Sequence, residues 1–281
     1  MQITNKIFKE AIDINVSSAI NEDIKNSDIT SVLTSSKLNA LAEIKAKEKG
    51  VLCGIPWVEK TYRKIDPKTK FTWLVKEGDI FKKNQKICKI YGNFNSLLAG
   101  ERIALNFLQT LSGTATITKA FVSKIKTTSS ILFDTRKTLP GLRIAQKYAV
   151  KIGGGMNQRL GLYDEILVKE NHIKSNGSIE KTFQKINNKQ ISNYQVEVEN
   201  LKQLQLAIKF GAKNILLDNF SISSIRKAVA INNNLASLEV SGNINIHNIL
   251  DYAKTGVNRI SVGAITKNIE AIDFSMIIDT I

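Results

Sequence analysis

Short apolar segments alternate with helical stretches over the second part of the chain, from residue 114 onward. Such alternation predicts a parallel sheet with helices outside it. No GxGxxG loop follows the first of these strands, which favours a closed or nearly closed α/β barrel over an open dinucleotide-binding sheet. The predicted strands are residues 131–133, 165–168, 194–198, 214–217, 237–240 and 259–262, and the predicted helices are 142–151, 201–210, 222–231 and 246–254.

The first 111 residues have a different pattern and predict a separate α+β unit. Ser96 is a predicted N-cap for a helix that runs to Leu111. The alternating stretch after residue 71 also resembles lipoyl- and biotinyl-carrier domains, but it has no lysine in a DKA or MKM context at a hairpin tip. The other predicted elements are a strand over 41–47, a helix over 56–65, and strands within 71–91 around a Gly78-Asp79 turn. We therefore expect domains over residues 1–111 and 112–267, with residues 268–281 packing back on the first domain.

The formal net charge of +15 raises the question of nucleic-acid binding. The lysines are spread along the chain with no run of five, which is more typical of a solvated basic surface and an anionic substrate. No apolar run approaches the ~18 residues of a membrane span, and the N-terminus lacks the apolar core of a signal peptide. Cys53 and Cys88 form no disulfide framework. We expect a soluble, cytoplasmic protein that binds neither nucleic acid nor membrane.

The predicted strands end repeatedly in charged residues, serine or glycine, at the edge where α/β barrels build their active sites. Arg136, Lys137, Arg159 and Lys169 form a candidate pocket for carboxylates or phosphates, because so many cations near one point need an anionic ligand. The competing interpretation is local ion pairing of Arg136 with Asp134, or of Lys169 with Glu170, which contributes little when exposed.

Carboxylates and glycines end the remaining strands. Glu197 and Asp218, on successive strands, are suited to ribose hydroxyls or to Mg²⁺ carried by a diphosphate. Glu199 has the same two-residue phase as Glu197, but it lies at the edge of the following helix. Glycines at the last two strand ends, in Ser241-Gly242-Asn243 and at Gly263, allow a phosphate to approach backbone N–H groups. Of the two histidines, His172 is a candidate site residue, and His247 is a predicted surface residue.

Several segments together resemble the quinolinate phosphoribosyltransferase family, over nearly the whole chain. They are NEDIKNSDIT, AGERIALNFLQTLSG, DTRKTLPGLRIAQKYAV, GGGMNQRLGLYDEILVKENHI, VEVEN, LLDN, EVSGNI and ISVGAIT, in the family's order. The resemblance implies an N-terminal α/β sandwich domain and a C-terminal seven-stranded α/β barrel. It also implies a homodimer, or an assembly of dimers, that makes nicotinate mononucleotide, CO₂ and pyrophosphate for NAD biosynthesis.

The resemblance also implies roles for individual residues. Quinolinate's carboxylates would be held by Arg136 and Arg159, with Lys137 and Lys169 contributing and Arg102 reaching in from the partner subunit. Gln158 would also contact the substrate. Phosphoribosyl pyrophosphate and its Mg²⁺ would be held by Glu197, Asp218, Ser241, Gly242, Asn243 and Gly263. Lys137, Lys169, Glu197 and Asp218 would form the catalytic set, and no direct protein ligands for the metal are expected.

The chain departs from the family pattern at three positions. Asn157-Gln158-Arg159 stands where the family usually has NHR, and Ser241-Gly242-Asn243 stands where it usually has SGG. Lys267 stands where a histidine is usual. A glutamine can donate a hydrogen bond to a carboxylate but cannot carry a charge. These changes leave two alternatives open: a paralogue of the same fold found with molybdenum transport genes, and a catalytically silent binding protein.

Overall fold

The computed structural model describes residues 3–25, 28–34 and 38–281. The chain forms two compact units. The parallel-sheet unit comprises residues 120–137 and 155–264. The antiparallel-sheet unit comprises the chain up to Lys119 together with residues 138–154 and 265–281.

A four-stranded antiparallel sheet is the centre of the antiparallel-sheet unit. Its order is β12 (Phe274–Thr280), β1 (Asn39–Ala46), β5 (Lys86–Asn93) and β3 (Lys70–Trp73), and β2 (Gly50–Val51) pairs separately with β4 (Ile80–Phe81). Every second residue of β1, from Ala40 to Ala46, is buried, as the alternating sequence predicts. The pairing of β12 with β1 attaches the C-terminal segment to this sheet.

The helices α1 (Asn5–Asp23), α2 (Ile55–Ile65) and α3 (Phe94–Ile125) belong to the same unit, except for the last residues of α3. The helix α3 is longer than the predicted helix and continues through residue 111 to Ile125. Gly113 lies within this helix and does not interrupt it. A Cβ at Gly113 would lie 2.3 Å from the Glu270 carbonyl oxygen, so only glycine permits this close packing. In the NEDIKNSDIT segment α1 ends at Asp23 and a 3₁₀ helix, η1 (Ile29–Leu33), follows, while residues 26–27 lie outside the described ranges.

The predicted helix over residues 142–151 forms as α4 (Arg143–Ile152), but it lies in the antiparallel-sheet unit rather than beside the parallel strands. Its Tyr148 ring packs against Phe8 at 4.8 Å and Trp57 at 5.5 Å between ring centroids. An amphipathic pattern identifies a helix that needs an apolar partner, but it does not say which partner. The compact units therefore group residues 138–154 with the antiparallel sheet, while the domain boundary between residues 111 and 112 stays a prediction.

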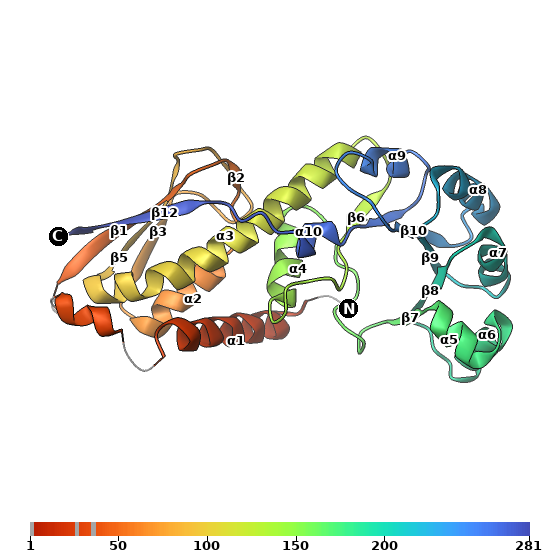
Figure 1. Cartoon of the computed structure of the whole chain (residues 1–281), viewed down its shortest axis with the longest axis horizontal. Coiled ribbons are helices and arrows are strands. Elements are labelled where there is room, and N and C mark those ends of the chain that lie inside the picture. The colour runs from red at the N-terminus through yellow and green to blue at the C-terminus, as the bar shows by residue number, and fades with distance from the viewer. Residues whose placement is uncertain (1–2, 26–27, 35–37) are drawn as a thin grey trace. The chain divides into compact units, whose positions relative to one another are not determined.

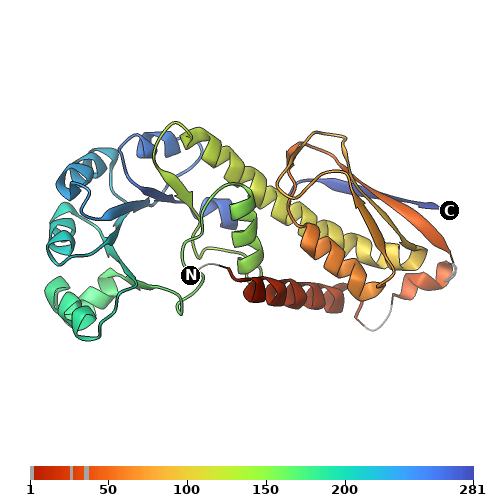
Figure 2. The same cartoon turned by 180° about the vertical axis from the view of Figure 1, so that it is seen from behind.

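In the described residues, six parallel strands form the sheet of the parallel-sheet unit, and all six overlap the predicted strands. Their order is β6 (Ile131–Phe133), β11 (Arg259–Ser261), β10 (Ser237–Ser241), β9 (Asn214–Asp218), β8 (Tyr194–Val198) and β7 (Ile166–Val168). Figures 1 and 2 show the helices along the outer side of this sheet. They are α5 (Glu170–Asn176), α6 (Ile179–Asn188), α7 (Leu201–Lys209), α8 (Ile222–Asn232) and α9 (Ile249–Ala253), while the short α10 (Ala264–Lys267) follows β11.

The α/β class is confirmed, with a parallel sheet in the C-terminal part and a separate N-terminal sheet. Within the described ranges the pairing gives a six-stranded parallel sheet, and the seventh strand of the expected barrel stays a prediction. Beyond β6, a single parallel bridge joins Phe133 to Met156. Among the described residues no pairing joins β7 to β6, so the strand ladder is not closed. The segment after Met156 leads from the β6 edge to β7 at the opposite edge.

Candidate active site

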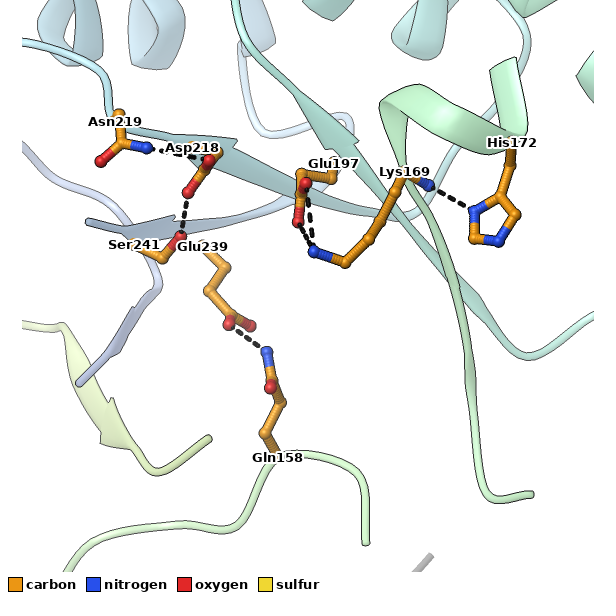
Figure 3. Close-up of polar contacts among 8 residues, drawn as sticks. All are labelled: Gln158, Lys169, His172, Glu197, Asp218, Asn219, Glu239 and Ser241. Atoms are coloured by element: carbon orange, nitrogen blue, oxygen red, sulfur yellow. Dashed lines mark hydrogen bonds and ion pairs between the residues drawn. The ribbon is translucent and has the colours of Figure 1, made fainter. Parts of the chain in front are cut away.

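The carboxyl ends of neighbouring parallel strands bring side chains from distant parts of the sequence together. Alternate residues of a strand point to opposite faces, so Glu197 on β8, Asp218 on β9 and Ser241 on β10 lie on one face, which we call the inner face. The Ser241 hydroxyl donates to Asp218 Oδ1 at 2.8 Å, and Asn219 Nδ2 donates to Asp218 Oδ2 at 2.9 Å (Figure 3). Asp218 is thereby held in one orientation at the sheet edge.

Lys169, directly after β7, forms an ion pair with Glu197. Its Nζ lies 3.1 Å from Glu197 Oε2 (Figure 3), and the lysine side chain is 48% exposed while that of Glu197 is 14% exposed. The expected alternative, a local pair between Lys169 and Glu170, is not the one formed: Glu170 pairs with Lys174 on the next turn of α5. A cation and a carboxylate from different strands therefore stand side by side, and both remain accessible to a ligand.

His172 has a structural contact. Its Nδ1 accepts a hydrogen bond from the Lys169 backbone N–H at 2.9 Å, which caps the start of α5 (Figure 3). This bond fixes the backbone at Lys169 and so helps to aim that side chain. His247 is exposed and lies just before α9, in the turn that Asn245 stabilises.

Arg136 and Arg159 approach each other within the parallel-sheet unit. Burial lowers the pKa of Arg159, and the positive charge of Arg136 lowers it further. Arg159 Nη1 also donates to the Glu165 carbonyl oxygen at 3.1 Å, which anchors its guanidinium. The negative charges of Glu165, Glu197 and Asp164 act in the opposite direction and raise this pKa. Two guanidinium groups near each other are suited to a ligand with more than one carboxylate or phosphate oxygen.

Lys137 lies beside Gly263, at the end of the strand next to β6. A Cβ at Gly263 would stand 3.0 Å from Lys137 Cδ and 3.3 Å from Thr135 Oγ1. The glycine therefore leaves room for the lysine side chain. Spacing in the sequence does not predict this contact, because 126 residues separate the two positions.

Asp134, at the end of β6, is a site residue whose role the sequence analysis missed. It is fully buried; its Oδ1 accepts from the Gln158 backbone N–H at 2.8 Å, and its Oδ2 accepts from Asn157 Nδ2 at 2.7 Å. Asp134 thus organises the loop that carries Arg159. The signal was its place at the strand end, directly before Thr135, Arg136 and Lys137.

Glu239 was also missed. It is a fully buried carboxylate on β10, and it accepts from Gln158 Nε2 at 2.7 Å and from Gln195 Nε2 at 2.9 Å. Its two-residue phase with Ser241 places it on the inner face, one layer below the strand end. Gln158, predicted to contact substrate, therefore has its amide nitrogen directed to this carboxylate (Figure 3).

The loop after β10 has the backbone that glycine permits. Gly242 has φ +103°, and a Cβ there would lie 2.1 Å from Asn219 Oδ1. Asn243 follows with φ +51°, in the left-handed region that asparagine tolerates better than most residues. Its side chain is exposed, and its carbonyl oxygen accepts from Asn248 Nδ2 at 3.1 Å.

Two residues singled out from the sequence belong to the other unit. Arg102 is an exposed residue of α3, and Lys267 is an exposed residue at the end of α10. Within the described ranges, no group of three or more histidine, cysteine, aspartate or glutamate side chains could hold a metal ion. No helix in the described part of the chain is long and apolar enough to cross a membrane.

A parallel α/β sheet with cations, carboxylates and glycines at its strand ends is the class of site that binds anionic and phosphate-bearing ligands. Comparison with known families is specific. The C-terminal domain of quinolinate phosphoribosyl transferase matches residues 114–277, and its N-terminal domain matches residues 28–112. The chain belongs to the quinolinate phosphoribosyl transferase family.

Individual relatives resemble the chain over most of its length. The probable nicotinate-nucleotide pyrophosphorylase (carboxylating) of Bacillus subtilis is 37% identical over 257 residues, which cover 91% of this chain and 89% of the relative. The mitochondrial quinolinate phosphoribosyltransferase (decarboxylating) 2 of Nicotiana glauca is 34% identical, covering 93% and 80%. The solved nicotinate-nucleotide pyrophosphorylase of Francisella tularensis has a TM-score of 0.92 at 43% identity, covering 96% of both chains.

Proposed function

We propose that the protein transfers the phosphoribosyl group of phosphoribosyl pyrophosphate to quinolinate, with decarboxylation. The products are nicotinate mononucleotide, CO₂ and pyrophosphate, so the enzyme is a pentosyltransferase of NAD biosynthesis. The observation that carries the proposal is the pairing of Lys169 with Glu197 beside the Asp218–Ser241 bond, at one sheet edge. These contacts bring a cation suited to the carboxylates of quinolinate close to polar groups suited to a sugar phosphate, all within the parallel-sheet unit.

The cations serve quinolinate, whose two carboxylates match the planar guanidinium groups of Arg136 and Arg159. Lys137 and Lys169 add positive charge, since each stands among these strand ends. Arg102, exposed on α3, reaches the site from the partner subunit of a homodimer. This role for Arg102 rests on the family resemblance.

The other strand ends serve phosphoribosyl pyrophosphate. Ser241, Gly242, Asn243 and Gly263 bind its 5′-phosphate, and Glu197 and Asp218 contact the ribose hydroxyls. Mg²⁺ enters with the diphosphate. Glu197 and Asp218 come from adjacent strands and are both partly exposed. Their carboxylates are suited to contact Mg²⁺ through water molecules, while the diphosphate oxygens bind the ion directly.

The reaction then follows from positioning and charge. The bond from ribose C1 to the diphosphate oxygen breaks, and its electron pair leaves with pyrophosphate. The pyridine nitrogen of quinolinate donates its lone pair to C1, while Glu197 and Asp218 stabilise the positive charge at that carbon. The cationic ring then accepts the electron pair of the adjacent C–COO⁻ bond, CO₂ leaves, and the ring carbon takes up a proton.

Purified protein, quinolinate, phosphoribosyl pyrophosphate and Mg²⁺ test the proposal, with nicotinate mononucleotide and CO₂ as the readout. We expect both products in equal amounts and no product without Mg²⁺. Quinolinate binding without turnover would favour a silent binding protein, and absence of quinolinate binding would favour the molybdenum-linked paralogue. A cytoplasmic location is part of the same proposal.

A further inference from the structure

Glu239 is an unusual buried charge. Its side chain is fully buried in the middle of the inner face, and the hydrogen bonds to its two oxygens come from the neutral amides of Gln158 and Gln195. Its ladder neighbour on β11, Arg259, places its guanidinium carbon over the Phe133 ring, 5.1 Å from the centroid. Burying a carboxylate costs free energy unless its hydrogen bonds are made, so the two amides are needed to keep it.

An ionised carboxylate also specifies how those amides are oriented. It can only accept hydrogen bonds, whereas an amide group can donate from its nitrogen or accept at its oxygen. Gln158 and Gln195 must therefore direct their nitrogens to Glu239 and their oxygens away from it. A flipped amide would oppose two oxygen atoms in a buried space, at the cost of an unsatisfied polar group.

Gln158 is consequently fixed at two points by two buried carboxylates. Glu239 accepts its side-chain amide at 2.7 Å (Figure 3). Asp134 accepts its backbone N–H at 2.8 Å. The next residue is Arg159, whose guanidinium is anchored at the Glu165 carbonyl. The conformation of this loop, and the direction of Arg159, therefore depend on contacts below the site.

We propose that Glu239 is a positioning residue for the acidic substrate. It holds the amide of Gln158 in one orientation and thereby fixes Arg159, while Gln195 holds the second oxygen of Glu239. The inference rests on the proposed function, because it concerns how that same site selects quinolinate. In this view Gln158 replaces the usual histidine with an uncharged group whose orientation is imposed from within the sheet.

The test is Glu239→Gln, which keeps the size of the side chain but removes its acceptor-only character. We expect quinolinate to bind about tenfold more weakly by titration calorimetry, corresponding to about 1.4 kcal/mol, with the affinity for phosphoribosyl pyrophosphate unchanged. The KM for quinolinate should rise more than kcat falls. Glu77→Gln is the matched control, since Glu77 is a largely buried carboxylate of the antiparallel-sheet unit that accepts two backbone N–H groups. It should leave both affinities unchanged.

A double-mutant cycle separates positioning from general damage. If Glu239 acts through Gln158, adding Glu239→Gln to Gln158→Ala should not weaken quinolinate binding further. Equal loss of affinity for both substrates, or additive effects in the cycle, would overturn the inference. If Glu239→Gln does not fold, Glu239→Asp replaces it, because the retracted carboxylate should also weaken quinolinate binding alone.

The two levels of the proposal fail in different ways. Wild-type protein that binds no quinolinate overturns the proposed function, and this inference with it. Wild-type protein that binds quinolinate, with a Glu239→Gln variant that binds it equally well, overturns only the role of Glu239.

Discussion

Gly242→Ala is the substitution for which the structure gives the most complete account. The alanine would have to adopt φ +103°, which costs about 1–3 kcal/mol for a residue with a Cβ. Its Cβ would also stand 2.1 Å from Asn219 Oδ1 and 3.2 Å from Asn219 Cα, so the asparagine must move. Moving it breaks the 2.9 Å bond to Asp218, worth about 1 kcal/mol at an exposed position. The expected total is about 2–4 kcal/mol.

A matched control separates the two contributions. Gly211→Ala imposes a similar backbone conformation, φ +81°, at the end of α7, where a Cβ would meet nothing within 4 Å. It should cost only about 1 kcal/mol and leave both substrate affinities unchanged. Both variants are compared with wild type by urea denaturation and by titration with phosphoribosyl pyrophosphate in the presence of Mg²⁺.

We expect Gly242→Ala to weaken phosphoribosyl pyrophosphate binding by at least about tenfold, or about 1.4 kcal/mol, with quinolinate affinity unchanged. The reason is that both the loop for the 5′-phosphate and the orientation of Asp218 change together. Stability losses equal to those of Gly211→Ala would show that Asn219 does not restrict this position. Unchanged affinity for phosphoribosyl pyrophosphate would remove the loop from the phosphate site.

Three other predictions concern different parts of the molecule. Arg136→Lys should weaken quinolinate binding by about 1–3 kcal/mol, because a lysine cannot make the bidentate contact; unchanged calorimetric affinity would exclude Arg136 from the pocket. Mixed dimers of Arg102→Ala and Lys169→Ala chains should regain one intact site per dimer, and no recovery of turnover would place Arg102 in its own subunit's site. Burial raises the pKa of Glu77 above its unfolded value, so wild type should lose stability as pH rises from about 4.3 through the folded pKa. In Glu77→Gln this loss should be absent from urea denaturation curves, and identical pH profiles would contradict the argument.

The parallel strands could be predicted from the sequence because each is a short apolar run with a polar end. Ile215 and Leu217 are fully buried on one face of β9, and Asp218 follows on the other. The same pattern predicts that Glu197, Asp218 and Ser241 lie at one edge of the sheet. Local periodicity is sufficient there, since strand direction and pleat fix where each side chain points.

The assignment of helices to units could not be predicted in the same way. The helix containing Tyr148 was correctly recognised, but its apolar face meets Phe8 and Trp57 rather than the parallel sheet. The continuous α3 shows the same limit. In the sequence, Gly113 is compatible with either a helix break or a close backbone contact. The structure shows the close contact, which is with the carbonyl oxygen of Glu270.

The candidate site was predicted as a row of strand ends, and the structure adds a second row beneath it. Asp134 and Glu239 carry no ligand role in that prediction, yet both hold the loop before Arg159. Asp134 accepts two hydrogen bonds from this loop, and Glu239 accepts one from Gln158 and a second from Gln195 on β8. The partners of Glu239 lie 81 and 44 residues away in the chain, so no local pattern connects them. A two-residue phase, extended back from Ser241, would have identified Glu239 as an inner-face carboxylate that needs donors. The glutamine at position 158, where the family usually has histidine, then has a physical explanation. Its amide donates a hydrogen bond to Glu239, so this buried carboxylate stays satisfied although the side chain at position 158 cannot carry a positive charge.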